Sequence, residues 1–244
     1  MKMIPKKIHY CWFGKDPFPE HIKQWMQSWK VFCADYEIIE WNADNFNFST
    51  NEYARQAYEA KKWAFASDYA RLFVLYHYGG IYLDCDIELF KSLDLFLIDK
   101  AFAGFEHSGM VGASIMGAEQ GHAFIKTLLD SYNNRTFIKE NGTFDYTTIP
   151  ELITTHCLAC GLTPNKGHQK QVLADFTIYP SNYFYRKYWE DSKLIITDET
   201  YAFHHFEGFW LPLHRKVWRT FLRKIKKYLP FLVYIYKKMR VNHV

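Results

Sequence analysis

The sequence predicts an α/β layer fold in which helices form the crossovers between strands. Short apolar strand patterns alternate along the chain with segments whose apolar residues recur every three or four positions. The chain has 244 residues, of which 49% are hydrophobic, so it can bury one substantial core. The clearest local signal is a helix pattern followed by two glycines and a short strand within residues 64–86.

The expected elements follow one another in a nearly regular order. Strands are predicted where short apolar and aromatic runs occur, near 7–13, 36–41, 81–83, 101–105, 114–116 and 176–179. Helices are predicted where apolar residues have helical spacing, near 20–32, 51–58, 64–78, 122–132 and 150–159. This order favours a layered α/β domain, and no internal repeat interrupts it.

The helix pattern at 64–78 carries two charged residues on one face. Its apolar positions have the spacing of a buried face, and they are Phe65, Tyr69, Leu72, Phe73 and Tyr76. Asp68 and Arg71 are three positions apart, so they share a face of this helix. Gly79 and Gly80 then end the helix, because glycine enters the left-handed backbone region without a side-chain clash.

A pair of carboxylates follows the next strand. Residues 81–83 are apolar and indicate a buried strand, after which Asp84 and Asp86 point to the same side if the extended backbone continues. Carboxylate oxygens are hard ligands that suit Mg2+ or Mn2+ bridging to a diphosphate. The sequence therefore predicts a metal site for a phosphorylated donor. The competing interpretation is a surface ion pair between Asp68 and Arg71, with a solvated acidic loop after the strand.

This region resembles the signature of sugar transferases that carry a DXD motif. The matching positions are Ser67-Asp68-x-x-Arg71, Tyr78-Gly79-Gly80 and Tyr82-x-Asp84-x-Asp86. Within these enzymes the chain resembles glycosyltransferase family 32, the group of yeast initiating mannosyltransferases and many bacterial capsule enzymes. The large clostridial glucosylating toxins share the signature. The segment from Ile4 to Gly14 and the pair Trp41-Asn42 resemble the same family, so the resemblance extends over roughly the first 120 residues.

The resemblance implies a GT-A nucleotide-diphospho-sugar transferase fold, an α/β architecture with a central mixed sheet flanked by helices. In such a fold the nucleotide sugar binds near the carboxyl ends of the strands. By this resemblance Trp12 would stack on the nucleotide base, and Tyr82 would line the nucleotide pocket. Asp68 and Arg71 would hold the donor sugar.

The resemblance also assigns roles to the two carboxylates. Asp84 would contact the ribose, the sugar or metal-bound water, and Asp86 would bind the metal directly. The implied cofactor is Mn2+ or Mg2+, with a nucleotide sugar as co-substrate. Arg71 and the metal would stabilise the departing diphosphate. Enzymes of this kind usually retain the anomeric configuration of the donor.

A second, weaker resemblance lies near the carboxyl terminus. Family members close the site with His-His-Trp-x-x-Ser-Trp, and residues 204–210 read His-His-Phe-Glu-Gly-Phe-Trp. His205 is expected to complete the metal sphere, whereas His204 is expected to be structural or on the surface. Trp210 could donate its indole N–H to the diphosphate. Phe209 replaces the serine, so a hydroxyl contact to metal or phosphate is in doubt.

The positive charge of the chain is concentrated in a tail. The net charge is +4, yet no acidic residue follows Glu207, whereas ten Lys or Arg residues lie between Arg215 and Arg240. We therefore expect a catalytic domain at 1–210 and a basic amphipathic tail at 211–244. The apolar stripe of the tail consists of Trp218, Phe221, Leu222, Ile225 and Leu229.

Such a tail suits the surface of an anionic membrane. Its alternatives are a helix packed on its own domain and a homodimer contact. The five cysteines are scattered, and no signal peptide or N-terminal anchor is expected, which favours a peripheral position on the cytoplasmic face of the membrane. A nucleic-acid partner is not expected, because the basic residues are confined to one tail and no recognition motif accompanies them.

The predicted function is metal-dependent sugar transfer from a nucleotide sugar, with a UDP-sugar as the expected donor. The expected acceptor is a glycan or a lipid-linked oligosaccharide in capsular or exopolysaccharide synthesis. Two other functions remain open at this stage. One is a metal-dependent nucleotidyl or phosphoryl transferase, and the other is a non-catalytic, membrane-associated glycan-binding protein.

Overall fold

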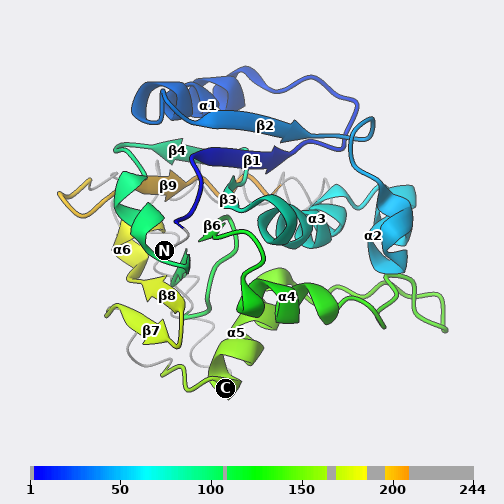
Figure 1. Cartoon of the computed structure of the whole chain (residues 1–244). Helices are drawn as coiled ribbons and strands as arrows, with labels where there is room; N and C mark the ends of the chain where they lie inside the picture. Colours follow the sequence, from blue (N-terminus) through cyan, green and yellow to red (C-terminus); the bar gives the residue numbers. More distant parts are fainter. Residues whose placement is uncertain (1–2, 107–108, 164–168, 186–195, 209–244) are drawn as a thin grey trace, which may run out of the picture.

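The computed structural model describes residues 3–106, 109–163, 169–185 and 196–208, and these form a central sheet with helices on both faces (Figure 1). The seven strands have the order β2-β1-β3-β6-β5-β8-β7. Their bounds are β1 (Lys7–Cys11), β2 (Glu37–Trp41), β3 (Gly80–Leu83), β5 (Ala101–Gly104), β6 (Ile115–Ala118), β7 (Gln171–Leu173) and β8 (Phe176–Tyr179). Five strands run in one direction, whereas β6 and β7 are antiparallel to their neighbours. The predicted fold class, a central mixed sheet flanked by helices, is confirmed.

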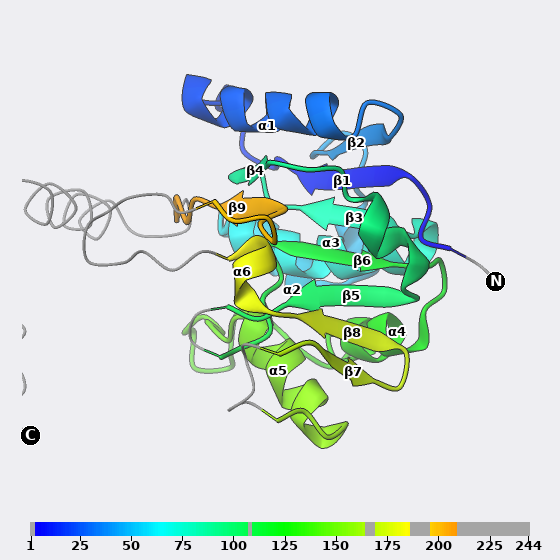
Figure 2. The same ribbon diagram turned by 90° about the vertical axis from the view of Figure 1, so that its left-hand side faces the viewer.

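A second, two-stranded sheet lies beyond the carboxyl ends of the central strands. It pairs β4 (Ile87–Leu89) with β9 (Ala202–His204) in antiparallel orientation, and Ile87 faces His204 in the register. Figure 2 shows this pair on the side of the molecule toward which β1 and β3 point. A segment from the far end of the described chain is therefore joined to the segment that follows β3.

Helices cover both faces of the central sheet, and each face has its own hydrophobic core. One face packs against α2 (Glu52–Glu59), α3 (Trp63–Tyr78), α4 (Ala123–Asp130) and α5 (Ile149–Ala159). The other packs against α1 (Glu20–Phe32), α6 (Ser181–Phe184) and the 3-10 turn η2 (Asp94–Ile98), while a second such turn, η1 (Phe48–Thr50), precedes α2. In the described part of the chain, no helix has the length and apolar character needed to cross a bilayer.

All six expected strands and five expected helices are present, with ends that differ by a residue or two. The elements that the sequence did not predict are β4, β7, β9, α6 and the two 3-10 turns, all five residues long or shorter. Elements of this length contain too few positions to establish a hydrophobic period. The division expected at residue 210 lies outside the described residues.

The turn between α3 and β3 requires glycine. Gly79 has a φ of +62°, and an added Cβ would lie 2.8 Å from the backbone nitrogen of Gln120. Gly79→Ala should therefore destabilise the fold by about 2–3 kcal/mol, because left-handed strain and a backbone clash add together. Gly121→Ala is the matched control: its φ is +80° but nothing lies within 4 Å of the added Cβ. Urea unfolding of both variants tests this, and equal losses would contradict it.

A buried histidine holds the same turn against β1. Trp41 Nε1 donates to His9 Nδ1 at 3.1 Å, so the other ring nitrogen, Nε2, carries the hydrogen of the neutral ring. That nitrogen donates to the Gly79 carbonyl oxygen at 2.8 Å. Burial lowers the pKa of His9 to about 4. The neutral ring is thus the form that the native core accommodates.

This lowered pKa makes a prediction for acid stability. The unfolded chain takes up the His9 proton near pH 6.5 and the folded chain only near pH 4, so the folded state loses stability as the pH falls between these values. Between pH 7 and pH 4.5, the free energy of unfolding should therefore fall by about 2 kcal/mol less in His9→Gln than in the wild type. Denaturant unfolding at the two pH values measures the difference. The exposed His21, replaced by Gln, serves as the control and should behave like the wild type.

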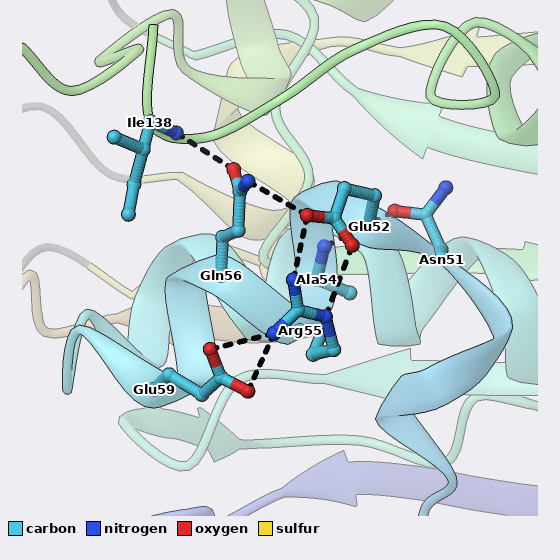
Figure 3. A network of polar contacts seen from close by, with 7 residues as sticks. All are labelled: Asn51, Glu52, Ala54, Arg55, Gln56, Glu59 and Ile138. Carbon is cyan, nitrogen blue, oxygen red and sulfur yellow. Dashed lines mark hydrogen bonds and ion pairs between the residues drawn. The ribbon is translucent and has the colours of Figure 1, made fainter. Parts of the chain in front are cut away.

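Helix α2 ties a long loop to the body of the domain. Arg55 pairs with Glu52 at 2.6 Å and with Glu59 at 2.7 Å, and Figure 3 shows its guanidinium group between the two carboxylates. On the same surface, Gln56 Oε1 accepts a hydrogen bond from the backbone N–H of Ile138 at 2.8 Å. The exposed ion pairs add little stability. The bond to Ile138 matters more, because it fixes the loop that leads to α5 and the site described next.

Candidate active site

A cavity of about 670 Å³ opens where β1, β3 and β5 end. Parallel strands place their carboxyl ends at one edge of a sheet, so the residues that follow each strand meet there. The amino-terminal half of α3 and the start of α5 form further walls. The polar and aromatic lining includes Trp12, Arg71, Asp84, Asp86, Glu106 and His204.

Arg71 is the central cation of this cavity. Its side chain is only 6% exposed and lies between two carboxylates, with Nη2 3.0 Å from Asp68 Oδ1 and 3.3 Å from Asp84 Oδ1. Nη1 donates to the Ala113 carbonyl oxygen at 2.7 Å, and the guanidinium group lies over the Tyr82 ring at 4.7 Å. Asp68 and Arg71 therefore share a helix face as expected, and they form a buried ion pair instead of the surface pair of the competing interpretation.

Burial sets the charge states of this group. It raises the pKa of Asp68 to about 7, although Arg71 opposes the shift. Burial also raises the pKa of Asp84, again against the attraction of Arg71. Burial by itself lowers the pKa of Arg71, but Asp84, Tyr82 and Asp68 together raise it, so the guanidinium group stays charged. A fixed positive charge thus lies on the cavity wall, where it can face an anionic ligand.

Two carboxylates and a histidine form a second cluster beside Arg71. Asp84, Asp86 and His204 each offer a ligand atom, and these atoms lie within 4.8 Å of one another. The backbone is not extended here: Ile87 N–H donates to the Asp84 carbonyl oxygen at 3.0 Å, so a turn brings the carboxylates together. The Asp84 and Asp86 carboxylates therefore lie close together as expected, but through a turn and not through an extended backbone. Oxygen ligands with one imidazole fit Mn2+ or Mg2+.

Asp86 is held from two sides. Its Oδ1 lies 3.2 Å from His204 Nε2, and its Oδ2 accepts a hydrogen bond from the backbone N–H of Glu207 at 2.8 Å. Burial would raise the pKa of Asp86, but His204 and the Glu207 amide lower it overall. Burial lowers the pKa of His204, and Asp86 raises it above the usual value. Asp86 is therefore ionised and oriented, as a metal ligand must be.

The structure places His204, and not the predicted His205, next to the carboxylates. His205 Nε2 lies 2.9 Å from Glu88 Oε2, and its ring stacks on Trp25 at 3.6 Å. Successive side chains of a strand point to opposite sides, so β9 directs His204 into the cavity and the next residue away from it. The sequence motif contains both histidines. Which of the two faces the cavity depends on the register of the short strand β9.

This assignment predicts different metal affinities for two variants. His204→Asn should weaken Mn2+ binding about tenfold or more, because the imidazole beside Asp86 is lost. His205→Asn, the matched control, should bind Mn2+ like the wild type. Titration calorimetry with Mn2+ and a nucleoside diphosphate compares them. A loss in His205→Asn alone would restore the assignment made from the sequence.

Two of the three aromatic residues predicted to contact the donor, Trp12 and Tyr82, line the cavity, and the third, Trp210, is outside the described residues. Trp12 lines the cavity, stacks on Phe18 at 4.2 Å and donates from Nε1 to the Asp16 carbonyl oxygen at 2.8 Å. Tyr82 is 1% exposed and lies beneath the Arg71 guanidinium group. The positions expected to close the site, 209 and 210, and the tail at 211–244 are not among the described residues.

Known proteins resemble the part of the chain that contains Arg71, Asp84 and Asp86. Residues 19–103 match the family described as a glycosyltransferase sugar-binding region containing a DXD motif. Inositol phosphoceramide mannosyltransferase 3 of Schizosaccharomyces pombe is 29% identical over 154 residues, 60% of this chain and 41% of that protein. A mannosyl phosphorylinositol ceramide synthase of Saccharomyces cerevisiae is 32% identical over 134 residues, 53% of this chain and 35% of that protein. The chain thus spans less than half the length of these relatives.

Solved structures show a distant likeness. The PaToxG glycosyltransferase superposes with a TM-score of 0.49 at 19% identity, over 65% of this chain and 70% of that one. A glycosyltransferase involved in glycosylation of the major capsid of PBCV-1 gives 0.44 at 10% identity, over 82% and 93%. Neither score reaches 0.5, so the identification depends on the sequence match. Residues 19–103, which contain Arg71 and both DXD carboxylates, match the sugar-binding region of the DXD glycosyltransferases.

Proposed function

We propose that this protein is a metal-dependent glycosyltransferase of the GT-A type that transfers a sugar from a nucleotide-sugar donor. The observation that carries the proposal is one cavity in which a buried arginine adjoins a cluster of two carboxylates and a histidine. A nucleotidyl transferase would also need paired carboxylates, and the match to a sugar-binding region favours sugar transfer. The GT-A assignment agrees with the mixed sheet and the position of the cavity.

The cavity offers a partner for each part of such a donor. The metal, Mn2+ or Mg2+, would be held by Asp84, Asp86 and His204, and when bound it would neutralise charge on the diphosphate. Arg71, beside this cluster, would add a fixed positive charge. Trp12 offers an aromatic ring for the base, and Asp68, which pairs with Arg71, would hold the sugar.

The reaction transfers the sugar to an acceptor hydroxyl group. A new bond forms between the hydroxyl oxygen and the anomeric carbon, and the bond from that carbon to the diphosphate oxygen breaks. The proton of the hydroxyl goes to the departing diphosphate if attack occurs on the same face, which retains the anomeric configuration. The task of Arg71 is to stabilise the charge that develops on that diphosphate.

The acceptor and location are proposed from weaker indications. The two yeast relatives are named for mannosyl transfer to a ceramide lipid. A lipid-linked acceptor agrees with the basic, aromatic composition of residues 211–244, which suits the cytoplasmic surface of an anionic membrane. We therefore propose a glycan or lipid-linked acceptor in surface polysaccharide synthesis. Liposome flotation with and without anionic lipid tests the membrane contact directly.

A donor screen tests the function. The full chain is incubated with Mn2+ and a panel of UDP- and GDP-sugars, including GDP-mannose, and the release of free sugar is followed without acceptor. We expect one donor to be hydrolysed slowly and EDTA to abolish the turnover. Release of a nucleoside monophosphate together with the sugar 1-phosphate would instead indicate a nucleotidyl or phosphoryl transferase. If no donor of the panel is hydrolysed and no Mn2+-dependent nucleotide binding is found, a glycan-binding protein would be favoured.

A further inference from the structure

Glu106 is an acidic side chain of the cavity wall that the proposed reaction has not used. It follows β5 directly, and its backbone N–H donates to the Met110 carbonyl oxygen at 2.7 Å. Its side chain is partly buried and lines the cavity together with Asp84 and His204. It is close enough to both, and to Arg71, for their charges to affect its own titration.

Within the described part of the chain, the carboxylate of Glu106 differs from its neighbours in having no protein partner. Asp68 and Asp84 pair with Arg71, and Asp86 pairs with His204. Among the residues that the structure describes, none donates a hydrogen bond or forms an ion pair with the Glu106 carboxylate. A partly buried charge without a donor costs stability. Such a cost is expected where a side chain is kept for a ligand.

The surrounding structure makes room for this side chain. Gly112 lies opposite, and a Cβ there would be 2.8 Å from Glu106 Cγ and would also overlap the Tyr185 hydroxyl group. That hydroxyl group is itself fixed, because it accepts a hydrogen bond from Ser114 Oγ at 2.8 Å. The lack of a side chain at Gly112 thus leaves the space that the Glu106 side chain occupies.

Charge indicates which part of the donor Glu106 faces. The diphosphate is anionic, so a carboxylate directed at it would be repelled. The sugar is neutral and offers hydroxyl donors, and it adjoins the diphosphate that Arg71 and the metal cluster would hold. We propose that the Glu106 carboxylate accepts a hydrogen bond from a hydroxyl group of the transferred sugar. This inference depends on the proposed function and adds a residue that selects a hydroxylated sugar.

The test separates the sugar from the rest of the donor. Affinities with Mn2+ are measured for the nucleotide sugar that the wild type hydrolyses and for its nucleoside diphosphate alone. Glu106→Ala should bind the diphosphate like the wild type but the nucleotide sugar about tenfold or more weakly. Glu106→Gln should lose less, because its amide oxygen still accepts a hydrogen bond. Glu88→Gln, outside the cavity lining, should change neither affinity.

Other outcomes overturn the proposal in distinguishable ways. Unchanged affinity of Glu106→Ala for both ligands would show that the residue makes no contact with the sugar. An equal loss for both ligands would place its role in the metal site or in folding. If the wild type binds no nucleotide sugar while Mn2+ and diphosphate still bind, the proposed function itself fails. One outcome would support the proposal. If a nucleotide sugar that lacks one sugar hydroxyl group binds the wild type and Glu106→Ala equally, that hydroxyl group is the one that Glu106 contacts.

Discussion

Asp86→Asn should lower donor hydrolysis by about 100- to 1000-fold in kcat/KM, because it removes the charge that a divalent metal needs at the centre of the cluster. The amide keeps the size of the side chain and can still accept from the Glu207 N–H, so the fold should be preserved. Initial rates with and without added Mn2+ provide the measurement. Excess Mn2+ should recover part of the activity if the loss lies in metal affinity.

The control for this prediction lies in the same segment of the chain. Glu88 is two residues further along, pairs with His205 and does not line the cavity. Glu88→Gln should therefore keep the activity of the wild type. Full Mn2+-dependent turnover in Asp86→Asn would show that the metal ligand has been assigned to the wrong carboxylate.

Arg71→Met should be the most destabilising change in the cavity. It leaves Asp68 and Asp84 buried without their shared cation, and loss of one partner from a buried ion pair costs about 3–5 kcal/mol. Activity should fall as well, because the leaving diphosphate loses its fixed positive charge. Urea unfolding gives the stability, and single-donor hydrolysis gives kcat/KM for the folded fraction.

Arg135 provides a matched control for this change. It pairs with Asp145 at 2.7 Å and lies over the Tyr53 ring, away from the cavity lining. Arg135→Met should lower stability but leave kcat/KM of the folded protein unchanged. If both variants lose stability while kcat/KM of the folded protein stays unchanged in both, Arg71 is a structural residue. If Arg71→Met keeps its stability, then the two carboxylates are protonated at neutral pH and need no cation.

The sequence predicted the parts of the site that depend on local spacing. Asp68 and Arg71 share a helix face because they are three residues apart, and the glycines fix where that helix ends. Asp84 and Asp86 are brought together by a turn that the alternating pattern did not indicate. The positions of the long helices along the chain also followed from the sequence, since each of them has several turns of periodic signal, whereas the order of the strands in the sheet did not.

The remaining parts depend on tertiary contacts. His204 joins the cluster only because β9 pairs with β4, and a three-residue strand has no detectable period in the sequence. The Ala113 carbonyl oxygen accepts a hydrogen bond from Arg71, and a contact made by a backbone atom cannot be predicted from the residue type. Glu106 is distinguished because no residue in the described ranges pairs with its carboxylate, which a single sequence cannot reveal.

The last described residues connect the cavity to whatever follows them in the chain. Glu207 donates its backbone N–H to Asp86, and Gly208 lines the cavity. Residues 207 and 208 therefore join a cavity side chain and the cavity lining to the segment that follows them. A displacement of Glu207 would also displace the backbone N–H that orients the Asp86 carboxylate.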